Sequence, residues 1–223
     1  MPRERHRAGQ AAAALLLAVT APVSFAIAIG IWLSDSGPVF YLADRVGLHG
    51  SIFRIWKFRT MRSGSNSGSR IAAPNDPRAF PFGALLRKLK LDELPQLLNI
   101  TRGEMAFVGP RPEDPWFVEH AYSEADRQTL DVLPGLTSPG TLYYLAHAEQ
   151  FLSAGDTEVS YVSGPLKRKL ELDRAYVSKA SASLDARLIF ETICVLACVA
   201  LGRRDFPGRR FDTLDAGGHQ PGD

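Results

Sequence analysis

Residues 82–100 read FGALLRKLKLDELPQLLNI, and this stretch contains two helical pieces that meet near Asp92. Proline is tolerated in the first turn of a helix, where its missing N–H has no partner in any case, so Pro95 predicts that the second helix begins at Asp92 or just after it. Asp92 is then a candidate N-cap, because the free N–H groups and the helix dipole would stabilise its carboxylate. The stretch indicates a fold that is largely helical here.

Glu93 stands directly beside Asp92, although a capping acid needs no second acid next to it. Like charges raise each other's pKa unless a cation holds them. Mg²⁺ typically takes one or two carboxylates and completes its shell with water and substrate phosphates, so the pair can divide into a metal ligand and a nucleophile. An anionic nucleophile that attacks a diphosphate also needs nearby cations to offset the repulsion. Simple capping by Asp92 remains the alternative.

Basic residues flank the acidic pair on both sides. Arg87, Lys88 and Lys90 precede it, and the run GPRP at 109–112 follows it. In that run two prolines hold the backbone extended around Arg111, which can then bind a phosphate through two parallel hydrogen bonds at low entropic cost. A rigid turn with an exposed arginine is the alternative for Arg111.

Two strand-like segments lie upstream of the acidic pair. SDSGPVFY at 34–41 opens the first, and SIFRIWKFRTM at 51–61 is rich in β-branched and aromatic residues. A turn at 47–50 joins them, which predicts a small antiparallel hairpin. The two-residue period of a strand places Lys57 and Arg59 on one face, which is a modest sign of function, and a solvated or lipid-facing edge is the alternative.

A long apolar segment occupies the N-terminal part of the chain. It runs from Ala11 to Leu33 without a charge, and a simple span needs only about 20 residues. A cleaved signal peptide, a straight transmembrane anchor, and a helix that enters the bilayer, bends and returns are three interpretations. Pro22 at the midpoint favours the bend, and basic residues on both flanks favour two cytoplasmic ends. We predict the re-entrant helix, with a kinked spanning helix as the alternative.

Composition limits the class of protein. The chain has 223 residues, 45% of them hydrophobic, and a net charge of +2, which suits one sizeable core and gives no sign of nucleic-acid binding. Cys194 and Cys198 form neither a disulfide framework nor the four-ligand pattern of a structural zinc site. Residues 206–223 are polar and glycine-rich, which predicts a disordered tail.

Several blocks together resemble the bacterial sugar transferase family, the monotopic phosphoglycosyl transferases. The most specific are KFRTM at 57–61, LDELPQLLN at 91–99 and GPRP at 109–112, and the likeness runs in the same order from about residue 11 to residue 200. The resemblance implies that a sugar 1-phosphate passes from a UDP-sugar to a polyprenyl phosphate such as undecaprenyl phosphate, with release of UMP. This reaction would be the first step of exopolysaccharide, lipopolysaccharide or glycoconjugate synthesis, at the cytoplasmic face of the bacterial inner membrane.

The resemblance also implies roles for individual residues. Asp92 would be the nucleophile that forms a covalent phosphosugar intermediate, and Glu93 would be the ligand of Mg²⁺. Asp173 would be a supporting acid. The cations that bind the substrate phosphates would be Lys57, Arg59, Arg87 and Arg111.

The chain departs from the family's pattern after PGLT at 134–137. Many members read GWAQVNGR there, whereas this chain reads SPGTLYYLAHAE at 138–149 and lacks the closing arginine, with His147 or Glu149 near its place. The altered block motivates a second hypothesis, a non-catalytic, membrane-anchored assembly factor that retains the fold. Within enzymes, a single-step transfer with Asp92 as base or metal ligand is the alternative to a covalent intermediate.

We therefore predict an α+β protein, mostly helical with a small antiparallel sheet, and monotopic in the membrane. Residues 1–36 would form the re-entrant segment in the lipid bilayer, 37–205 the catalytic domain on the cytosolic face, and 206–223 the disordered tail.

Overall fold

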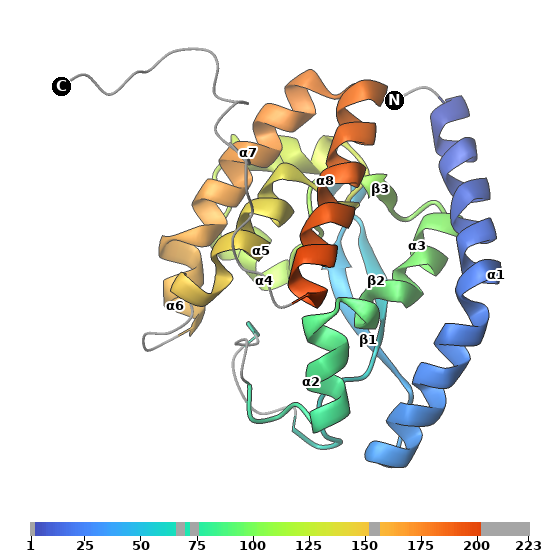
Figure 1. The fold of residues 1–223 in the computed structure, drawn as a ribbon. Helices are drawn as coiled ribbons and strands as arrows, with labels where there is room; N and C mark the ends of the chain where they lie inside the picture. The colour runs from blue at the N-terminus through green and yellow to red at the C-terminus, as the bar shows by residue number, and fades with distance from the viewer. Residues whose placement is uncertain (1–2, 66–69, 72–75, 152–156, 202–223) are drawn as a thin grey trace.

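A computed structural model describes residues 3–65, 70–71, 76–151 and 157–201, in which helices dominate and strands are short (Figure 1). The first half contains α1 (Arg3–Ser34), β1 (Phe40–Val46), β2 (Ile52–Phe58), α2 (Pro81–Lys88), α3 (Leu97–Thr101) and β3 (Ala106–Val108). The second half contains α4 (Pro115–Ala121), β4 (Gly135–Thr137), α5 (Pro139–Phe151), α6 (Thr157–Ser163), α7 (Pro165–Lys179) and α8 (Ala182–Ala200). Short 3₁₀ helices cover Leu48–Gly50, Leu91–Gln96 and Asp126–Asp131. The prediction of a mostly helical protein with a small antiparallel sheet is confirmed, whereas the predicted tail at 206–223 lies outside the described residues.

β1 and β2 form the predicted antiparallel hairpin. Phe40 pairs with Phe58 at one end and Val46 with Ile52 at the other, and the 3₁₀ turn between the strands includes His49 in the left-handed conformation, with φ of 54°. β2 ends at Phe58, so Arg59 lies beyond the strand and is not bound to its alternation of faces.

β3 and β4 form a second pair of strands, parallel and only three residues long on each side, which the sequence does not predict. Their ends approach closely, since a Cβ on Gly135 would lie 2.1 Å from the backbone nitrogen of Gly109. The backbone N–H of Gly135 donates to the carbonyl of Pro110 over 2.9 Å. The pair therefore fixes the start of the GPRP run that carries Arg111.

α1 is one helix of 32 residues with Pro22 inside it, and its ribbon bends part-way along its length (Figure 1). By length and composition, its part from His6 to Ser34 is long and apolar enough to cross a membrane. Large apolar side chains are exposed along it, namely Leu15, Leu16, Val19, Val23, Phe25, Ile29, Trp32 and Leu33. The helix is not interrupted at Pro22, so the re-entrant course stays a prediction.

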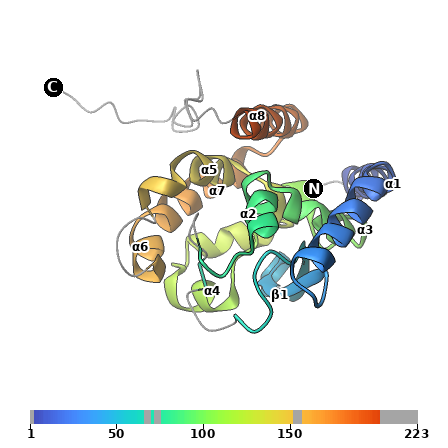
Figure 2. The same cartoon turned by 60° about the horizontal axis from the view of Figure 1, so that its bottom comes forward.

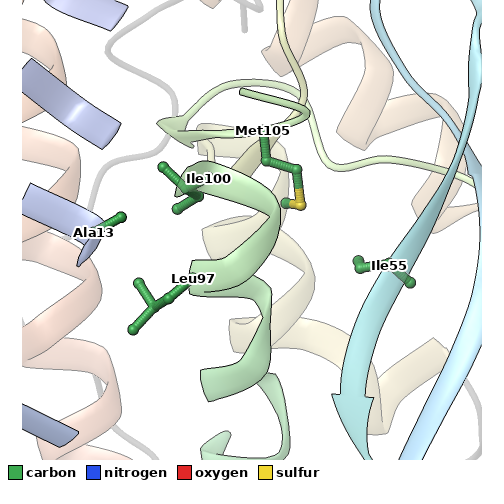
Figure 3. Packing of buried hydrophobic residues seen from close by; sticks show 5 residues of the cluster. All are labelled: Ala13, Ile55, Leu97, Ile100 and Met105. Atoms are coloured by element: carbon green, nitrogen blue, oxygen red, sulfur yellow. The ribbon is translucent and has the colours of Figure 1, made fainter. Parts of the chain in front are cut away.

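The inner face of α1 is part of the protein core. Ala13 packs with Leu97 and Ile100 of α3, with Met105 and with Ile55 of β2. Figure 3 shows α3 lying between α1 and β2, with these side chains in the two interfaces. A second cluster lies nearer the C-terminal end of α1 and contains Ile27, Ile31, Phe58, Phe80 and Leu86. α1 and the hairpin therefore share buried contacts.

α8 covers the parallel strands from one side. Leu188 and Val195 pack with Val108 of β3, Leu142 of α5 and Tyr176 of α7 in one buried cluster. The helix lies at the edge of the molecule (Figure 2), and its outer residues Ile189, Phe190 and Ile193 are exposed.

Candidate active site

The acidic pair lies in the 3₁₀ helix Leu91–Gln96, which links α2 to α3. Lys90, with φ of 58°, is left-handed and occupies the N-cap position. The prediction that Asp92 caps a helix is therefore wrong, because the chain turns two residues earlier and carries Asp92 into the first turn. Both acids are buried there, each with 8% of its surface exposed.

Glu93 is held by three cations. Its Oε1 accepts from Nη2 of Arg111 at 2.6 Å and from Nζ of Lys57 at 3.3 Å, and its Oε2 accepts from Nη1 of Arg111 at 3.2 Å. Nζ of Lys90 lies 3.9 Å from Oε1. Burial acts to raise the pKa of Glu93, but Arg111, Lys57 and Lys90 together hold it well below its usual range. Glu93 is thus a paired, ionised carboxylate at neutral pH.

Asp92 is placed differently, although it is the next residue. Its Oδ1 is buried and has no hydrogen-bond partner among the described residues. Burial raises the pKa of Asp92, and Lys57, Lys90 and Arg87 act in the opposite direction. Gln96, one turn further on, is fully buried with both amide atoms unpartnered in the described part of the chain. Oδ1 of Asp92 is thus without a hydrogen-bond partner in the described part of the chain, although several cations act on this carboxylate.

Lys57 and Arg87 reach this cluster from different elements. Lys57 lies near the end of β2, and burial lowers its pKa while Glu93 raises it. Arg87 is in the last turn of α2 and acts on Asp92 through its charge. Lys57 and Arg111 therefore contact the acidic pair and Arg87 acts on it through its charge, whereas phosphate binding by these cations stays a prediction.

Arg59 is not brought into the cluster. Its guanidinium forms an ion pair with the Asp35 carboxylate, just beyond the end of α1, and donates to the carbonyl of Pro38 at 2.5 Å and to Oγ of Ser63 at 2.9 Å. These contacts tie the end of α1 to the end of β2. The binding of phosphate by Arg59 stays a prediction that this arrangement does not favour.

Asp173 of α7 lies buried against the first turn of α5. Its Oδ1 accepts from the backbone N–H of Gly140 at 2.9 Å, and burial raises its pKa to about 6. One turn earlier on α7, Lys169 forms an ion pair with Glu113 and donates to the hydroxyl of Tyr161 at 2.8 Å. Glu113, Tyr161 and Lys169 were not predicted from the sequence. The available signal was the spacing of four between Lys169 and Asp173, which puts both on one helix face.

Comparison with known proteins identifies the family of the chain. The sequence model described as bacterial sugar transferase matches residues 6–198. The chain belongs to the bacterial sugar transferase family.

Relatives of this chain differ in length. It is 34% identical over 185 residues to a protein of Aeromonas hydrophila named UDP-N-acetylgalactosamine-undecaprenyl-phosphate N-acetylgalactosaminephosphotransferase, covering 82% of this chain and 41% of the relative. It is 32% identical to the UDP-glucose:undecaprenyl-phosphate glucose-1-phosphate transferase of Escherichia coli K12, covering 81% of this chain and 37% of the relative. It is 35% identical to the exopolysaccharide production protein ExoY of Rhizobium meliloti, with coverage of 86% and 84%. The chain thus spans about two fifths of the first two relatives and most of the third.

The block at 138–149, in which the chain departs from the expected family pattern, covers all but the last two residues of α5. Oγ of Ser138 accepts from the backbone N–H of Thr141 at 2.9 Å, and Gly140 packs against Lys169 and Asp173. Tyr144 is partly buried, and burial raises its pKa to about 12. The side chains of His147 and Glu149 lie outside the described part of the structure.

The carboxylates of Asp92 and Glu93 suit a magnesium ion that is also bound by a phosphate substrate. Among the described residues, no group of three or more His, Cys, Asp or Glu side chains is arranged to hold a metal ion. Asp92 and Glu93 offer two carboxylates, and Mg²⁺ commonly takes one or two with water and substrate phosphates as the remaining ligands. The residues therefore suit an ion that arrives with a phosphate substrate rather than one enclosed by protein.

Proposed function

We propose that this sugar transferase moves a sugar 1-phosphate from a UDP-sugar to a polyprenyl phosphate and releases UMP. The observation that carries the proposal is the division within the acidic pair, since Glu93 is bound by cations while Asp92 keeps a buried oxygen free of partners. Two relatives are named for transferring sugar phosphates from UDP-sugars to undecaprenyl phosphate, which supports the substrate classes.

The first step is attack by a carboxylate oxygen of Asp92 on the β-phosphorus of the UDP-sugar. The bond from that phosphorus to the bridging oxygen breaks, and UMP leaves with the bridging oxygen and its electron pair. Asp92 then carries the sugar phosphate as an acyl phosphate. Lys57, Arg87 and Arg111 offset the negative charge that would otherwise keep the carboxylate and the diphosphate apart.

The second step regenerates the enzyme. A phosphate oxygen of the polyprenyl phosphate attacks the same phosphorus, the bond to Asp92 breaks, and a polyprenyl diphosphate sugar forms beside a free carboxylate. The burial of Asp92 favours this route, because water that entered the site would hydrolyse the acyl phosphate.

Glu93 is the residue that would hold Mg²⁺, with its ionised carboxylate. When bound, the ion would neutralise phosphate charge on the donor. Both Nη atoms of Arg111 donate to Glu93, so the remaining N–H groups of its guanidinium are the ones that would bind the same phosphates.

We also propose that α1 holds the protein on the cytoplasmic leaflet of the bacterial inner membrane by a re-entrant course. The exposed apolar side chains of α1 support contact with lipid, and arginines stand on both flanks of the apolar segment. A site beside the headgroups would let a water-soluble donor meet a lipid phosphate. The lipid-linked product would begin the assembly of an exopolysaccharide or lipopolysaccharide.

The test is UMP release by the detergent-purified protein with undecaprenyl phosphate, Mg²⁺ and a panel of UDP-sugars. Asp92→Asn keeps the shape but removes the nucleophile, so we expect release to fall by several orders of magnitude. Glu119→Gln is the matched control, since this acid lies on α4 with a side chain that is 78% exposed. Equal rates in wild type and Asp92→Asn would contradict the assignment.

A β-³²P-labelled UDP-sugar separates the two enzymatic mechanisms. Label retained on wild-type protein without acceptor, and absent from Asp92→Asn, is expected for the covalent route. UMP release only when acceptor is present, without a labelled adduct, would indicate a single-step transfer. No release with any donor would favour the non-catalytic assembly factor that the altered block at 138–149 motivates.

A further inference from the structure

Two buried amide side chains follow the acidic pair, and they differ in their hydrogen bonding. Gln96 and Asn99 are both fully buried. Oδ1 of Asn99 accepts from the backbone N–H of Trp56 at 3.1 Å. Its Nδ2 donates to the carbonyl of Arg54 and to Oε2 of Glu104, each at 2.7 Å. The Asn99 amide therefore stabilises the fold, whereas Oε1 and Nε2 of Gln96 form no hydrogen bond within the described part of the chain.

Buried polar atoms without partners are concentrated in the helix of the acidic pair. Among the described residues, four buried side-chain nitrogen or oxygen atoms have no hydrogen bond, namely Oδ1 of Asp92, both amide atoms of Gln96 and Nε of Arg174. Nε of Arg174 lies 3.5 Å from the Asp126 carboxylate, so it has an ion-pair partner. An unpaired polar atom in a protein interior costs free energy, and such atoms in a native fold indicate a group that binds there. Asp92 and Gln96 are the residues to which this applies.

The 3₁₀ helix Leu91–Gln96 separates its side chains into rows, because residues three apart are aligned along a 3₁₀ helix. Leu91 and Leu94 form one row and pack against the hydrophobic cluster between α1 and β2. Gln96 is aligned with Glu93, whose carboxylate is held by the cations of the site. Gln96 therefore belongs to the row of the active site and not to the row of the leucines.

The chemistry of an amide suits an anion that is already surrounded by cations. A primary amide carries no charge and offers two donor hydrogens on its nitrogen and an acceptor on its oxygen. Phosphate oxygens accept hydrogen bonds, and a hydrogen bond to a charged group is stronger than one between neutral groups. Nε2 of Gln96 therefore suits a phosphate oxygen, and Oε1 suits a water molecule bound beside it.

We propose that Gln96 is a phosphate-binding residue of the active site: its buried amide donates through Nε2 to an oxygen of the donor's diphosphate, next to Asp92. Because the protein alone leaves the amide unpaired, the hydrogen bond forms only with the ligand. Gln96 then favours ligand binding at the expense of the stability of the protein alone. The inference deepens the proposed function, on which its account of the donor rests.

Two measurements on the full-length detergent-purified protein test this role, namely thermal unfolding without ligand and binding of inorganic diphosphate by isothermal titration calorimetry. Gln96→Met keeps the length of the side chain but removes both polar atoms. We expect its dissociation constant for diphosphate to rise about tenfold or more, because a hydrogen bond to a charged group is lost. We expect its melting temperature to rise by about 2–4 °C, since an apolar group replaces a buried unpaired amide.

Control variants give the contrasting results. Asn99→Leu should lower the melting temperature by about 4 °C or more, because it leaves buried backbone groups of β2 without a partner. Gln128→Met makes the same substitution at an exposed residue and should change neither measurement. Arg111→Gln should weaken diphosphate binding but lower the melting temperature, since Glu93 loses a buried partner.

The direction of both changes in Gln96→Met decides the proposal. Weaker diphosphate binding together with a higher melting temperature supports it. An unchanged dissociation constant overturns it, because the amide then binds only water. Weaker binding with a lower melting temperature also overturns it, since the protein alone would then need the amide. If Gln96→Met does not fold, Gln96→Leu decides by the same criteria, and failure of both variants to fold contradicts the proposal.

The outcome is independent of the reaction. Weaker diphosphate binding by a stabilised Gln96→Met, without UMP release by wild type from any UDP-sugar, would contradict the proposed function and leave the phosphate-binding role intact. UMP release by wild type, with Gln96→Met binding diphosphate normally, would do the reverse. Absence of diphosphate binding to wild type would overturn the phosphate-binding role.

Discussion

At the scale of single residues, the site depends on two adjacent carboxylates with opposite environments. Burial raises the pKa of Asp92, which has an unpartnered oxygen, whereas the cations around Glu93 hold its pKa well below the usual range. Different environments allow two like groups to take different chemical roles. The different pairing of the two acids therefore follows from their contacts, although the two side chains differ by only one methylene.

The raised pKa of Asp173 predicts that the free energy of unfolding depends on pH. Its pKa is raised by burial to about 6 from 3.8, so the folded protein binds a proton more tightly than the unfolded chain. This contribution to the free energy of unfolding is fully present below the unfolded pKa and is lost as pH rises through about 6. Asp173→Asn removes the titration while it keeps an acceptor for Gly140.

We expect wild type to lose about 1 kcal/mol of stability relative to Asp173→Asn between pH 5 and pH 7. Denaturant unfolding of both proteins at the two pH values measures the difference. If the difference in the free energy of unfolding between wild type and Asp173→Asn were the same at both pH values, Asp173 would not titrate in this interval.

The sequence reveals the acidic pair and most of its cations, because Lys57, Arg87 and Arg111 lie in recognisable blocks. It does not reveal the position of Arg59, since the strand ends one residue earlier and the side chain turns to Asp35. Lys169 is missed for a related reason: a lysine among other charges on a polar helix looks solvated until the tertiary fold buries it.

At the scale of elements, the parallel pair β3–β4 determines where Arg111 stands. Gly109 donates to the carbonyl of Thr137 at 3.0 Å, and Gly135 donates to the carbonyl of Pro110 at 2.9 Å. These bonds hold the first half of GPRP against a strand that begins 26 residues after Gly109. Three-residue strands have too few positions to show a two-residue period, which explains why the sequence predicts the longer hairpin and not this pair.

Gly135→Ala tests the contact between these backbones. A Cβ would lie 2.1 Å from the nitrogen of Gly109, and backbone cannot move as a flexible side chain does. We expect a loss of about 1–3 kcal/mol in stability and a larger dissociation constant for diphosphate, because Arg111 shifts with GPRP. Chemical denaturation and calorimetry measure the two effects.

Gly9→Ala is the matched control, since nothing lies within 4 Å of a Cβ at that position of α1. It should leave stability unchanged or raise it by up to about 1 kcal/mol, as alanine favours a helix. Equal free energies of unfolding for Gly135→Ala and Gly9→Ala would mean that β3 and β4 can move apart without loss of stability.

At the scale of the whole molecule, α1 has two different faces. One face of α1 packs into the core with the hairpin and α3, while the other exposes large apolar side chains. The outer face of α8 also exposes large apolar side chains. The apolar segment was evident from sequence, but its packing was not, because hydropathy alone does not separate lipid-facing from protein-facing residues. The helix therefore links any membrane contact directly to the strands that hold Lys57.

Ile31 and Leu33 distinguish these faces within one helical turn. Ile31 is fully buried against the cluster with Phe58 and Phe80, whereas Leu33 is 72% exposed. Ile31→Ala should lower the free energy of unfolding in detergent by about 2–5 kcal/mol, because it leaves a cavity between α1 and the hairpin. Leu33→Ala should change it by less than about 0.5 kcal/mol, since no protein packing is lost. Thermal and denaturant unfolding of both variants give the comparison, and UMP release should fall with stability only for Ile31→Ala. If both variants unfold like wild type, α1 adds no packing energy to the hairpin and the coupling between this helix and the site is absent.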